Sequence, residues 1–192
     1  MKNIEKYIQV FENVIPESLC DHIINEFEND EKKSEGKIYN NTVGEAKKTI
    51  DLFLDHREEK WKSIDSDIFR MVDKTVVDYM YFADVLIDSN TTAIADTGYR
   101  VQKYKKDEGK FLPHFDASGN IETVNRILAV IIYLNDVEVG GETNFPDLDY
   151  SIKPKKGRIL IFPCHYPMLH EGCIPISGDK YILNTFIVLT GR

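Results

Sequence analysis

Residues 126–146 read RILAVIIYLNDVEVGGETNFP and give the strongest indication of the fold. Positions 127–134 are apolar almost without interruption, so a strand here would be apolar on both of its faces. Such a strand lies inside a domain and is covered on both sides. Gly140 and Gly141 then mark a turn, and a short β-rich run follows at 143–145. The segment predicts a buried central strand that a glycine turn connects to a second strand.

The sequence on either side of this segment continues the β pattern. Short runs rich in β-branched and aromatic residues occur at 98–104, 158–162 and 181–189. Turn-forming residues separate them, namely Gly109, Gly119, Pro154, Gly157 and Gly178. Several short strands at this spacing are typical of a β-sandwich or barrel.

The first half of the chain has a helical texture instead. After a short apolar strand at 8–11, Pro16 and Glu17 suit a helix start, and apolar residues follow at helical spacing. Residues 29–45 are polar and are expected to form a loop. A longer helix is expected after Ser63, a plausible N-cap, with an apolar stripe from Ile64 to Ala83.

We therefore predict an α+β fold. One domain should span residues 1–192, with helical support over about 1–96 and a β core over about 97–192.

Composition and charge restrict the functional classes. The chain has 192 residues and a formal net charge of −8, which disfavours binding to nucleic acid. Local lysine clusters such as Lys47 and Lys48 are expected to be solvated loops. The longest apolar run is too short to span a bilayer, and the first residues do not resemble a signal peptide. Three cysteines argue for a reducing compartment. We expect a soluble cytoplasmic protein without a nucleic-acid or membrane partner.

The motif His114-Phe115-Asp116 is the first candidate for chemistry. Residues two apart on a strand point to the same face, so this imidazole and this carboxylate could bind one metal ion. His170 could complete the set. Two histidines and one carboxylate form the facial triad of non-haem iron(II) oxygenases. By itself the motif arises easily by chance.

Lys180 follows His170 by ten residues and shares strand parity with Ile182 and Asn184. A buried cation there would suit a co-substrate that carries a carboxylate. The alternative is a still exposed lysine at the start of the strand, paired with Asp179.

Cys164, His165, His170 and Cys173 could be mistaken for a zinc site. Their spacing does not fit the usual zinc patterns, so local packing is the better interpretation. His22 and His56 are interpreted as surface residues.

The order of motifs resembles the prolyl 4-hydroxylase branch of the 2-oxoglutarate oxygenases. That family has His-x-Asp, "YLND…GGET.F", "P.KG..L.F", His-x-Gly and a lysine ten residues later. This sequence has 114–116, 133–136, 140–145, 154–162, 170–172 and Lys180 in the same order. The resemblance covers residues 98–192 closely and extends weakly to FENVIPESLCDHII at 11–24.

The resemblance implies a double-stranded β-helix, a jelly-roll or cupin-like barrel, and a dioxygenase that uses iron(II), 2-oxoglutarate and O2. His114, Asp116 and His170 would be the iron ligands. Lys180 and Tyr104 would bind the distal carboxylate of 2-oxoglutarate, with Thr143 beside it. The products would be succinate, CO2 and a hydroxylated substrate, and ascorbate could serve as reductant.

The resemblance also implies a peptide or protein substrate containing proline, contacted by Arg126. Two family positions differ, because Phe111 stands where a tyrosine is usual and Phe186 where a tryptophan is usual. These changes remove two hydrogen-bond donors from the substrate pocket. Hydroxylation of another residue, a free amino acid or a small molecule therefore stays open, as does a non-catalytic binding module. The loops 36–49 and 117–125 are candidate lids.

Overall fold

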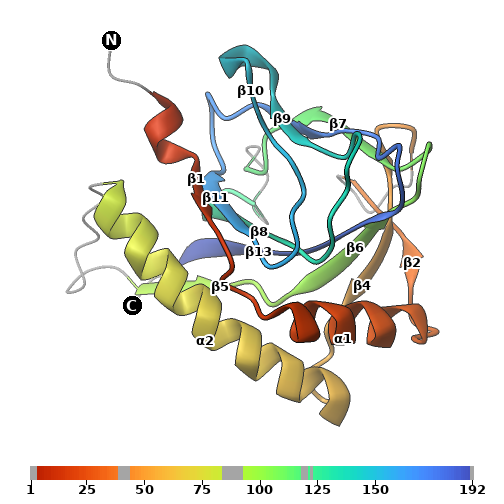
Figure 1. The fold of residues 1–192 in the computed structure, drawn as a ribbon. Coiled ribbons are helices and arrows are strands. Elements are labelled where there is room, and N and C mark those ends of the chain that lie inside the picture. Colours follow the sequence, from red (N-terminus) through yellow and green to blue (C-terminus); the bar gives the residue numbers. More distant parts are fainter. Residues whose placement is uncertain (1–3, 39–43, 84–92, 118–120, 122, 191–192) are drawn as a thin grey trace.

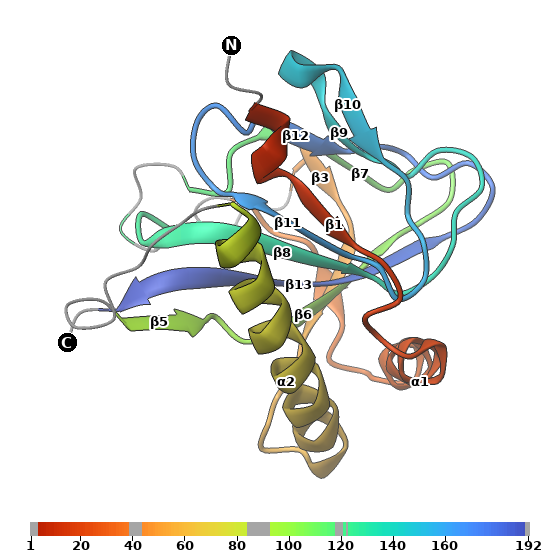
Figure 2. The ribbon, with the colours of Figure 1, turned by 60° about the vertical axis from the view of Figure 1, so that its left-hand side comes forward.

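The computed structural model describes residues 4–38, 44–83, 93–117, 121 and 123–190. Two β-sheets lie face to face, and two helices pack against the outer face of the larger sheet (Figures 1 and 2). The expected combination of helices and a double-stranded β-helix is confirmed. The two sheets do not join into a closed barrel in the described chain.

The larger sheet has eight strands in the order β1-β11-β8-β13-β6-β4-β2, with β5 paired to β13. Its strands are β1 (Gln9–Phe11), β2 (Ser34–Glu35), β4 (Ile50–Phe53), β5 (Ala93–Asp96), β6 (Arg100–Tyr104), β8 (Arg126–Tyr133), β11 (Ile159–Pro163) and β13 (Lys180–Thr190). The apolar run at 127–134 corresponds to β8. It lies between β11 and β13, so its prediction as a central strand is confirmed.

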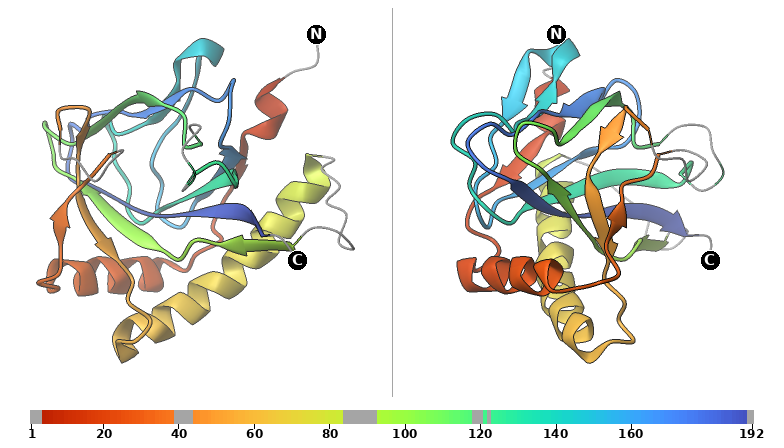
Figure 3. Two further views of the ribbon diagram at one scale, coloured as in Figure 1. Left: turned by 180° about the vertical axis from the view of Figure 1, so that it is seen from behind. Right: turned by 90° about the vertical axis from the view of Figure 1, so that its right-hand side faces the viewer.

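The smaller sheet has five strands in the order β10-β9-β12-β7-β3. Its strands are β3 (Lys47–Lys48), β7 (Lys110–His114), β9 (Thr143–Phe145), β10 (Tyr150–Ile152) and β12 (His170–Gly172). The described residues also include two short 3-10 helices, η1 (Ile4–Tyr7) and η3 (Pro146–Leu148). Figure 3 shows the smaller sheet above the larger one, with the helices on the side away from it.

Helices α1 (Glu17–Glu28) and α2 (Glu59–Phe82) each bury one apolar stripe. The stripe of α2 includes the expected Ile64, Ile68 and Val72. The N-cap prediction was wrong, because the helix is capped at Glu58 and Ser63 lies inside it. Trp61 is 1% exposed and lies one turn before Ile64. It therefore extends the buried stripe of α2 toward the N-terminus, beyond the aliphatic residues on which the prediction was based.

The expected loop at 29–45 is interrupted by β2, which pairs with β4. The sequence did not indicate β2, because this strand is only two residues long and both residues, Ser34 and Glu35, are polar. Strands β1 to β5 also show that residues before 97 contribute to both sheets. The division into a helical support and a catalytic core stays a prediction.

No helix in the described chain is both long and apolar enough to cross a membrane.

Candidate metal centre

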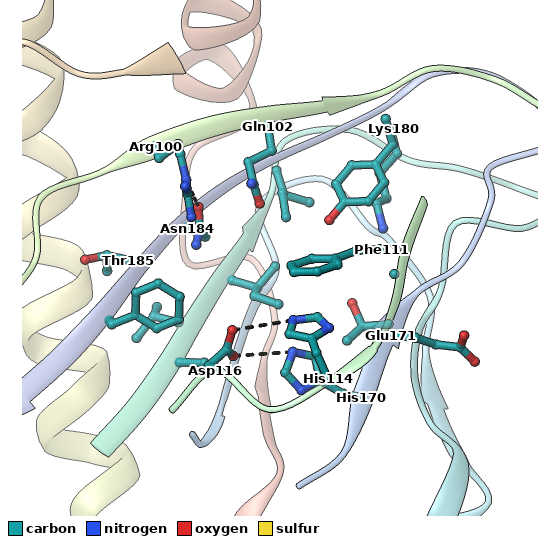
Figure 4. A pocket seen from close by; sticks show the side chains of 18 residues that line it. Arg100, Gln102, Phe111, His114, Asp116, His170, Glu171, Lys180, Asn184 and Thr185 are labelled. Carbon is teal, nitrogen blue, oxygen red and sulfur yellow. Dashed lines mark hydrogen bonds and ion pairs between the residues drawn. The ribbon is translucent and has the colours of Figure 1, made fainter. Parts of the chain in front are cut away.

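Three side chains converge between the sheets. His114 is the last residue of β7 and His170 is the first residue of β12, and the antiparallel register pairs the two directly. The Nε2 atom of His114 lies 3.6 Å from Oδ1 of Asp116, and Nε2 of His170 lies 3.3 Å from Oδ2 (Figure 4). Ligand atoms of all three lie within 4.8 Å of one another. Asp116 follows the end of β7, so the bend after the strand, rather than strand alternation, aims its carboxylate.

Backbone carbonyls fix the orientation of both imidazole rings. Nδ1 of His114 lies 2.8 Å from the carbonyl oxygen of Leu112, and Nδ1 of His170 lies 3.1 Å from that of Met168. Because a carbonyl oxygen only accepts, each Nδ1 must donate, which leaves the lone pair on Nε2. Outer contacts of this kind are typical of metal-binding histidines.

The charge states of His170 and Asp116 also suit a metal ion. Burial lowers the pKa of His170 to about 4, so its imidazole is neutral at pH 7. Burial opposes ionisation of Asp116, but His170, His114 and Arg126 outweigh it and lower the pKa of that carboxyl to about 2. Neutral imidazoles and an ionised carboxylate are the forms that bind metal.

Aromatic rings exclude water from one side of this centre. The ring of Phe111 stacks on His114 with centroids 3.6 Å apart. Phe162 packs edge-on against His170 at 4.6 Å, and Phe145 lies 5.8 Å from the same ring. Packing on several sides holds each imidazole in one rotamer, which gives a metal site its geometry.

Lys180 lies in the same cavity and is 1% exposed. Its Nζ donates to the carbonyl oxygen of Gly141 at 2.9 Å and lies 4.1 Å from the ring centroid of Tyr104. No carboxylate of the described residues forms an ion pair with it. The alternative of an exposed pair with Asp179 was wrong, since Asp179 pairs with Lys103 at 3.0 Å. Burial lowers the pKa of Lys180 to about 8.

A buried ammonium without a counter-ion is unfavourable unless a ligand supplies one. The cavity therefore contains a binding position for an anionic group beside the three converging side chains.

The other residues expected to bind co-substrate lie beside Lys180. Tyr104 and Thr143 line the cavity, and the Thr143 hydroxyl is 2.7 Å from the Tyr133 hydroxyl. Gly172 approaches Tyr104 closely, because a Cβ added there would meet a ring carbon of Tyr104 at 2.9 Å. The small residue after His170-Glu171 thus permits Tyr104 to face the cavity.

A wider cleft of about 1520 Å³ opens beside this cavity. It contains Arg126, whose guanidinium lies 3.9 Å from the ring centroid of Phe186 and donates to the Asp116 carbonyl oxygen at 3.2 Å. Phe111 and Phe186 line both the cavity and the cleft. All the residues expected to bind substrate therefore meet where the cavity opens.

The rival zinc cluster does not form. Among the described residues, the triad is the only group of three or more metal-binding side chains that converges. Cys164 is buried whereas His165 is exposed.

Parts of the candidate lids, 39–43, 118–120 and 122, lie outside the described residues. Within the first of them, Lys47 is 2% exposed and belongs to β3. The expectation that this lysine cluster is solvated was wrong for Lys47.

A polar cluster that the sequence did not indicate extends from the cavity wall into the cleft. It consists of Lys47, Asp51, Arg100, Gln102 and Asn184. Arg100 and Gln102 share the strand parity of Tyr104, which would have indicated that they face the site.

Comparisons with known proteins agree with this geometry. The family model described as "2OG-Fe(II) oxygenase superfamily" matches residues 99–188. The chicken prolyl 4-hydroxylase subunit alpha-1 is 33% identical over 99 residues, which cover 44% of this chain and 19% of that subunit. A putative prolyl 4-hydroxylase of Acanthamoeba polyphaga mimivirus is 43% identical over 67 residues, covering 31% of this chain and 28% of that protein. The chain thus spans well under a third of these relatives.

Solved structures share the fold. The viral collagen prolyl hydroxylase of Paramecium bursaria chlorella virus-1, in complex with 2OG, has a TM-score of 0.68 and 22% identity. That match covers 97% of this chain and 98% of the viral one. A Trichoplax adhaerens prolyl hydroxylase, in complex with a peptide fragment of hypoxia inducible factor, has a TM-score of 0.70 and 16% identity, over 95% of this chain and 84% of the other. Residues 99–188 are thus similar to the 2OG-Fe(II) oxygenase superfamily, and the chain shares its fold with solved prolyl hydroxylases.

Proposed function

We propose that this protein is an iron(II)- and 2-oxoglutarate-dependent oxygenase that hydroxylates proline in a peptide or protein. The observation that carries the proposal is the convergence of His114, Asp116 and His170 within 4.8 Å, beside the buried and unpaired Lys180. Two imidazoles and a carboxylate fit iron(II) and leave coordination positions open. The lone ammonium fits a dicarboxylate that also reaches the metal.

Each residue has a distinct part in this proposal. His114, Asp116 and His170 would hold the metal, while Lys180 and Tyr104 would hold the distal carboxylate of 2-oxoglutarate. Bound iron(II) and 2-oxoglutarate supply the oxidising chemistry, in which O2 hydroxylates an unactivated C–H bond and succinate and CO2 are released. The protein's share is to orient the reactants and to exclude water. Phe111, Phe145 and Phe162 exclude water on the protein side. Ascorbate as reductant stays a prediction.

The substrate is assigned from the cleft. A peptide lying in it would pass Phe111, Phe186 and Arg126 at the mouth of the cavity. The ring faces of Phe111 and Phe186 provide an apolar surface suited to a pyrrolidine ring. The names of the relatives support the same class, because a collagen prolyl hydroxylase and a prolyl hydroxylase bound to a peptide both share this fold. Location in the cytoplasm, one catalytic domain and action without a nucleic-acid partner stay predictions.

Turnover tests the proposal directly. Purified protein with iron(II), 2-oxoglutarate and O2 is offered proline-containing peptides, matched alanine peptides and free amino acids. We expect succinate release stimulated by the proline peptides, with one oxygen atom added to proline by mass spectrometry, and none in the His114→Ala variant. Stimulation by a free amino acid alone would replace the substrate assignment. Binding of iron and 2-oxoglutarate without stimulation by any candidate would point to a binding module.

A further inference from the structure

The polar cluster in the cavity wall has an unusual balance of charge. Asp51 accepts from Lys47 Nζ at 2.7 Å, from Thr49 Oγ1 at 2.7 Å and from Gln102 Nε2 at 3.0 Å. Arg100 Nη1 approaches the same carboxylate only to 3.6 Å. The Lys47 side chain is 1% exposed and that of Asp51 is 8% exposed. Two cations therefore share one largely buried carboxylate, which leaves one positive charge in excess.

The excess positive charge resides on Arg100, because Lys47 and Asp51 form a close ion pair in which the two charges neutralise each other. Arg100 Nε lies 3.4 Å from Oδ1 of Asn184, and its guanidinium lies 5.0 Å from the ring centroid of Phe53. Both polar contacts of Arg100 are longer than the roughly 2.7–2.9 Å of a good charge-assisted hydrogen bond. Within the described chain, no second carboxylate lies within ion-pair distance of Arg100. Neighbouring residues thus hold the guanidinium of Arg100 in place, but its N–H donors form only long polar contacts.

Arg100 also has a particular location. Five described residues line both the enclosed cavity and the open cleft, and Arg100 is the only cation among them. The others are Phe111, His114, Asp116 and Phe186. Figure 4 places Arg100 and Asn184 at one end of the cavity and Lys180 at the other, with the triad between and below them. The side chain of Arg100 is 21% exposed, so a ligand in the cleft can reach it.

We propose that Arg100, positioned by Asp51 and Asn184, binds a carboxylate of the substrate, so that the enzyme prefers peptides with a carboxylate close to the target proline. This inference rests on the proposed function and names the substrate class for the same site. A guanidinium binds a carboxylate through two parallel hydrogen bonds. One excess positive charge matches one carboxylate, whereas a doubly charged phosphate would also face the repulsion of Asp51 and Asp116.

Binding without turnover tests the proposal. Labelled peptides are titrated against the full chain with iron(II) and 2-oxoglutarate under anaerobic conditions, and fluorescence anisotropy gives each Kd. One arm compares peptides with Asp or Asn next to the target proline, and a second compares free acid with amide at a C-terminal target proline. We expect the carboxylate form to bind about 10- to 100-fold more tightly in one arm, as for a charge-assisted contact. The arm that shows the preference identifies the source of the carboxylate.

Two variants separate substrate recognition from a structural role. Arg100→Gln should abolish the preference while leaving the Kd of the neutral peptide within about twofold. Arg100→Glu should reverse it, so that a peptide with Lys next to proline binds more tightly than the Asp peptide, which a packing role cannot produce. Arg57→Gln is the matched control, because Arg57 lines the same cleft but forms two 2.8 Å contacts with Asp55. That control should retain the preference.

The results also distinguish this inference from the proposed function. Equal binding of acidic and neutral peptides by the wild type, or an unchanged preference in both Arg100 variants, would overturn the carboxylate site. Turnover of the neutral proline peptide would still support the hydroxylase in that case. A clear carboxylate preference that depends on Arg100, without hydroxylation of any peptide, would instead leave the site in place and overturn the proposed reaction.

Discussion

The two faces of the larger sheet have opposite characters. On one face, Leu183 and Ile187 of β13 pack with α1 and α2 in a hydrophobic cluster. The other face presents Lys180 and Asn184 from the same strand to the smaller sheet. Strand alternation produces this division, because neighbouring residues point to opposite sides.

The helix-covered face contributes mainly to stability, whereas the cavity-facing side provides the groups for binding and chemistry. The helix-covered face buries mainly apolar side-chain surface, and this burial is the main favourable term in folding. The space between the two sheets buries Lys47, Asp51, Lys180 and His170, and buried ionisable groups are unfavourable unless they are paired or bound. Mutations on the first face should therefore change stability, whereas those around the cavity should change binding, except where a charge is left unpaired.

The largest expected effect is on the free energy of unfolding, at the buried ion pair of Lys47 and Asp51. Lys47→Met removes the closest cation of the buried Asp51 and leaves it only the longer contact with Arg100. The free energy of unfolding should therefore fall by up to about 3–5 kcal/mol, the cost of breaking a buried ion pair. Urea denaturation measures the change. Lys48→Met is the control, because Lys48 is exposed and pairs with the exposed Glu45. An equal loss in both variants would show that the buried pair has no special part in stability.

Truncation on the helix-covered face comes next. Ile68 is fully buried in α2, so Ile68→Ala should lower the free energy of unfolding by about 2–5 kcal/mol. Turnover per folded molecule should stay unchanged, since the residue is remote from the cavity face. Phe69→Ala, at a neighbouring position that is 49% exposed, should change stability little. A fall in turnover with normal stability in Ile68→Ala would contradict the claim that the helix-covered face contributes to stability and not to turnover.

Lys180→Ala should act on binding alone. Loss of one charge-assisted contact should raise the KM for 2-oxoglutarate about 10- to 100-fold. Iron binding should persist, because Lys180 contacts none of the three metal-binding side chains. The two constants are measured separately, by succinate release and by anaerobic titration. An unchanged KM would remove Lys180 from the co-substrate site.

A smaller effect should follow pH. Burial lowers the pKa of Lys180 to about 8, so the free site is protonated below that pH and neutral above it. Binding a dicarboxylate requires the charged form, so above pH 8 the affinity for 2-oxoglutarate should fall by up to about tenfold per pH unit. Calorimetry from pH 7 to 9.5 measures this, and Lys180→Arg should lose the dependence because arginine stays charged. The same slope in both proteins would assign the titration to another group.

Much of the fold could be predicted from local patterns. The spacing of apolar residues predicts which positions are buried, and this holds for β8, β13 and the stripe of α2. Strands β2 and β3 could not be found in this way, because they are short, polar and held by partners distant in sequence. Lys47 illustrates the limit, since its burial depends on Asp51 and on the pairing of β3 with β7.

The site was predicted in part. The spacing of His114 and Asp116 suggested a metal pair, but residue chemistry alone left His170 and Lys180 open. Only the order of motifs resolved them, because the register that joins β7 to β12 is a long-range property. Arg100 went unnoticed, although its strand parity with Tyr104 indicates that it faces the site, because parity alone assigns no binding role.

Metal binding by the triad is the claim on which the account depends most. Anaerobic titration of iron(II) into the wild type should give one tight site per chain, and His170→Ala should lose it. His165→Ala is the matched control, because His165 is exposed and lies outside the triad. The account predicts wild-type affinity in His165→Ala and none in His170→Ala. Undiminished iron binding by His170→Ala would contradict it.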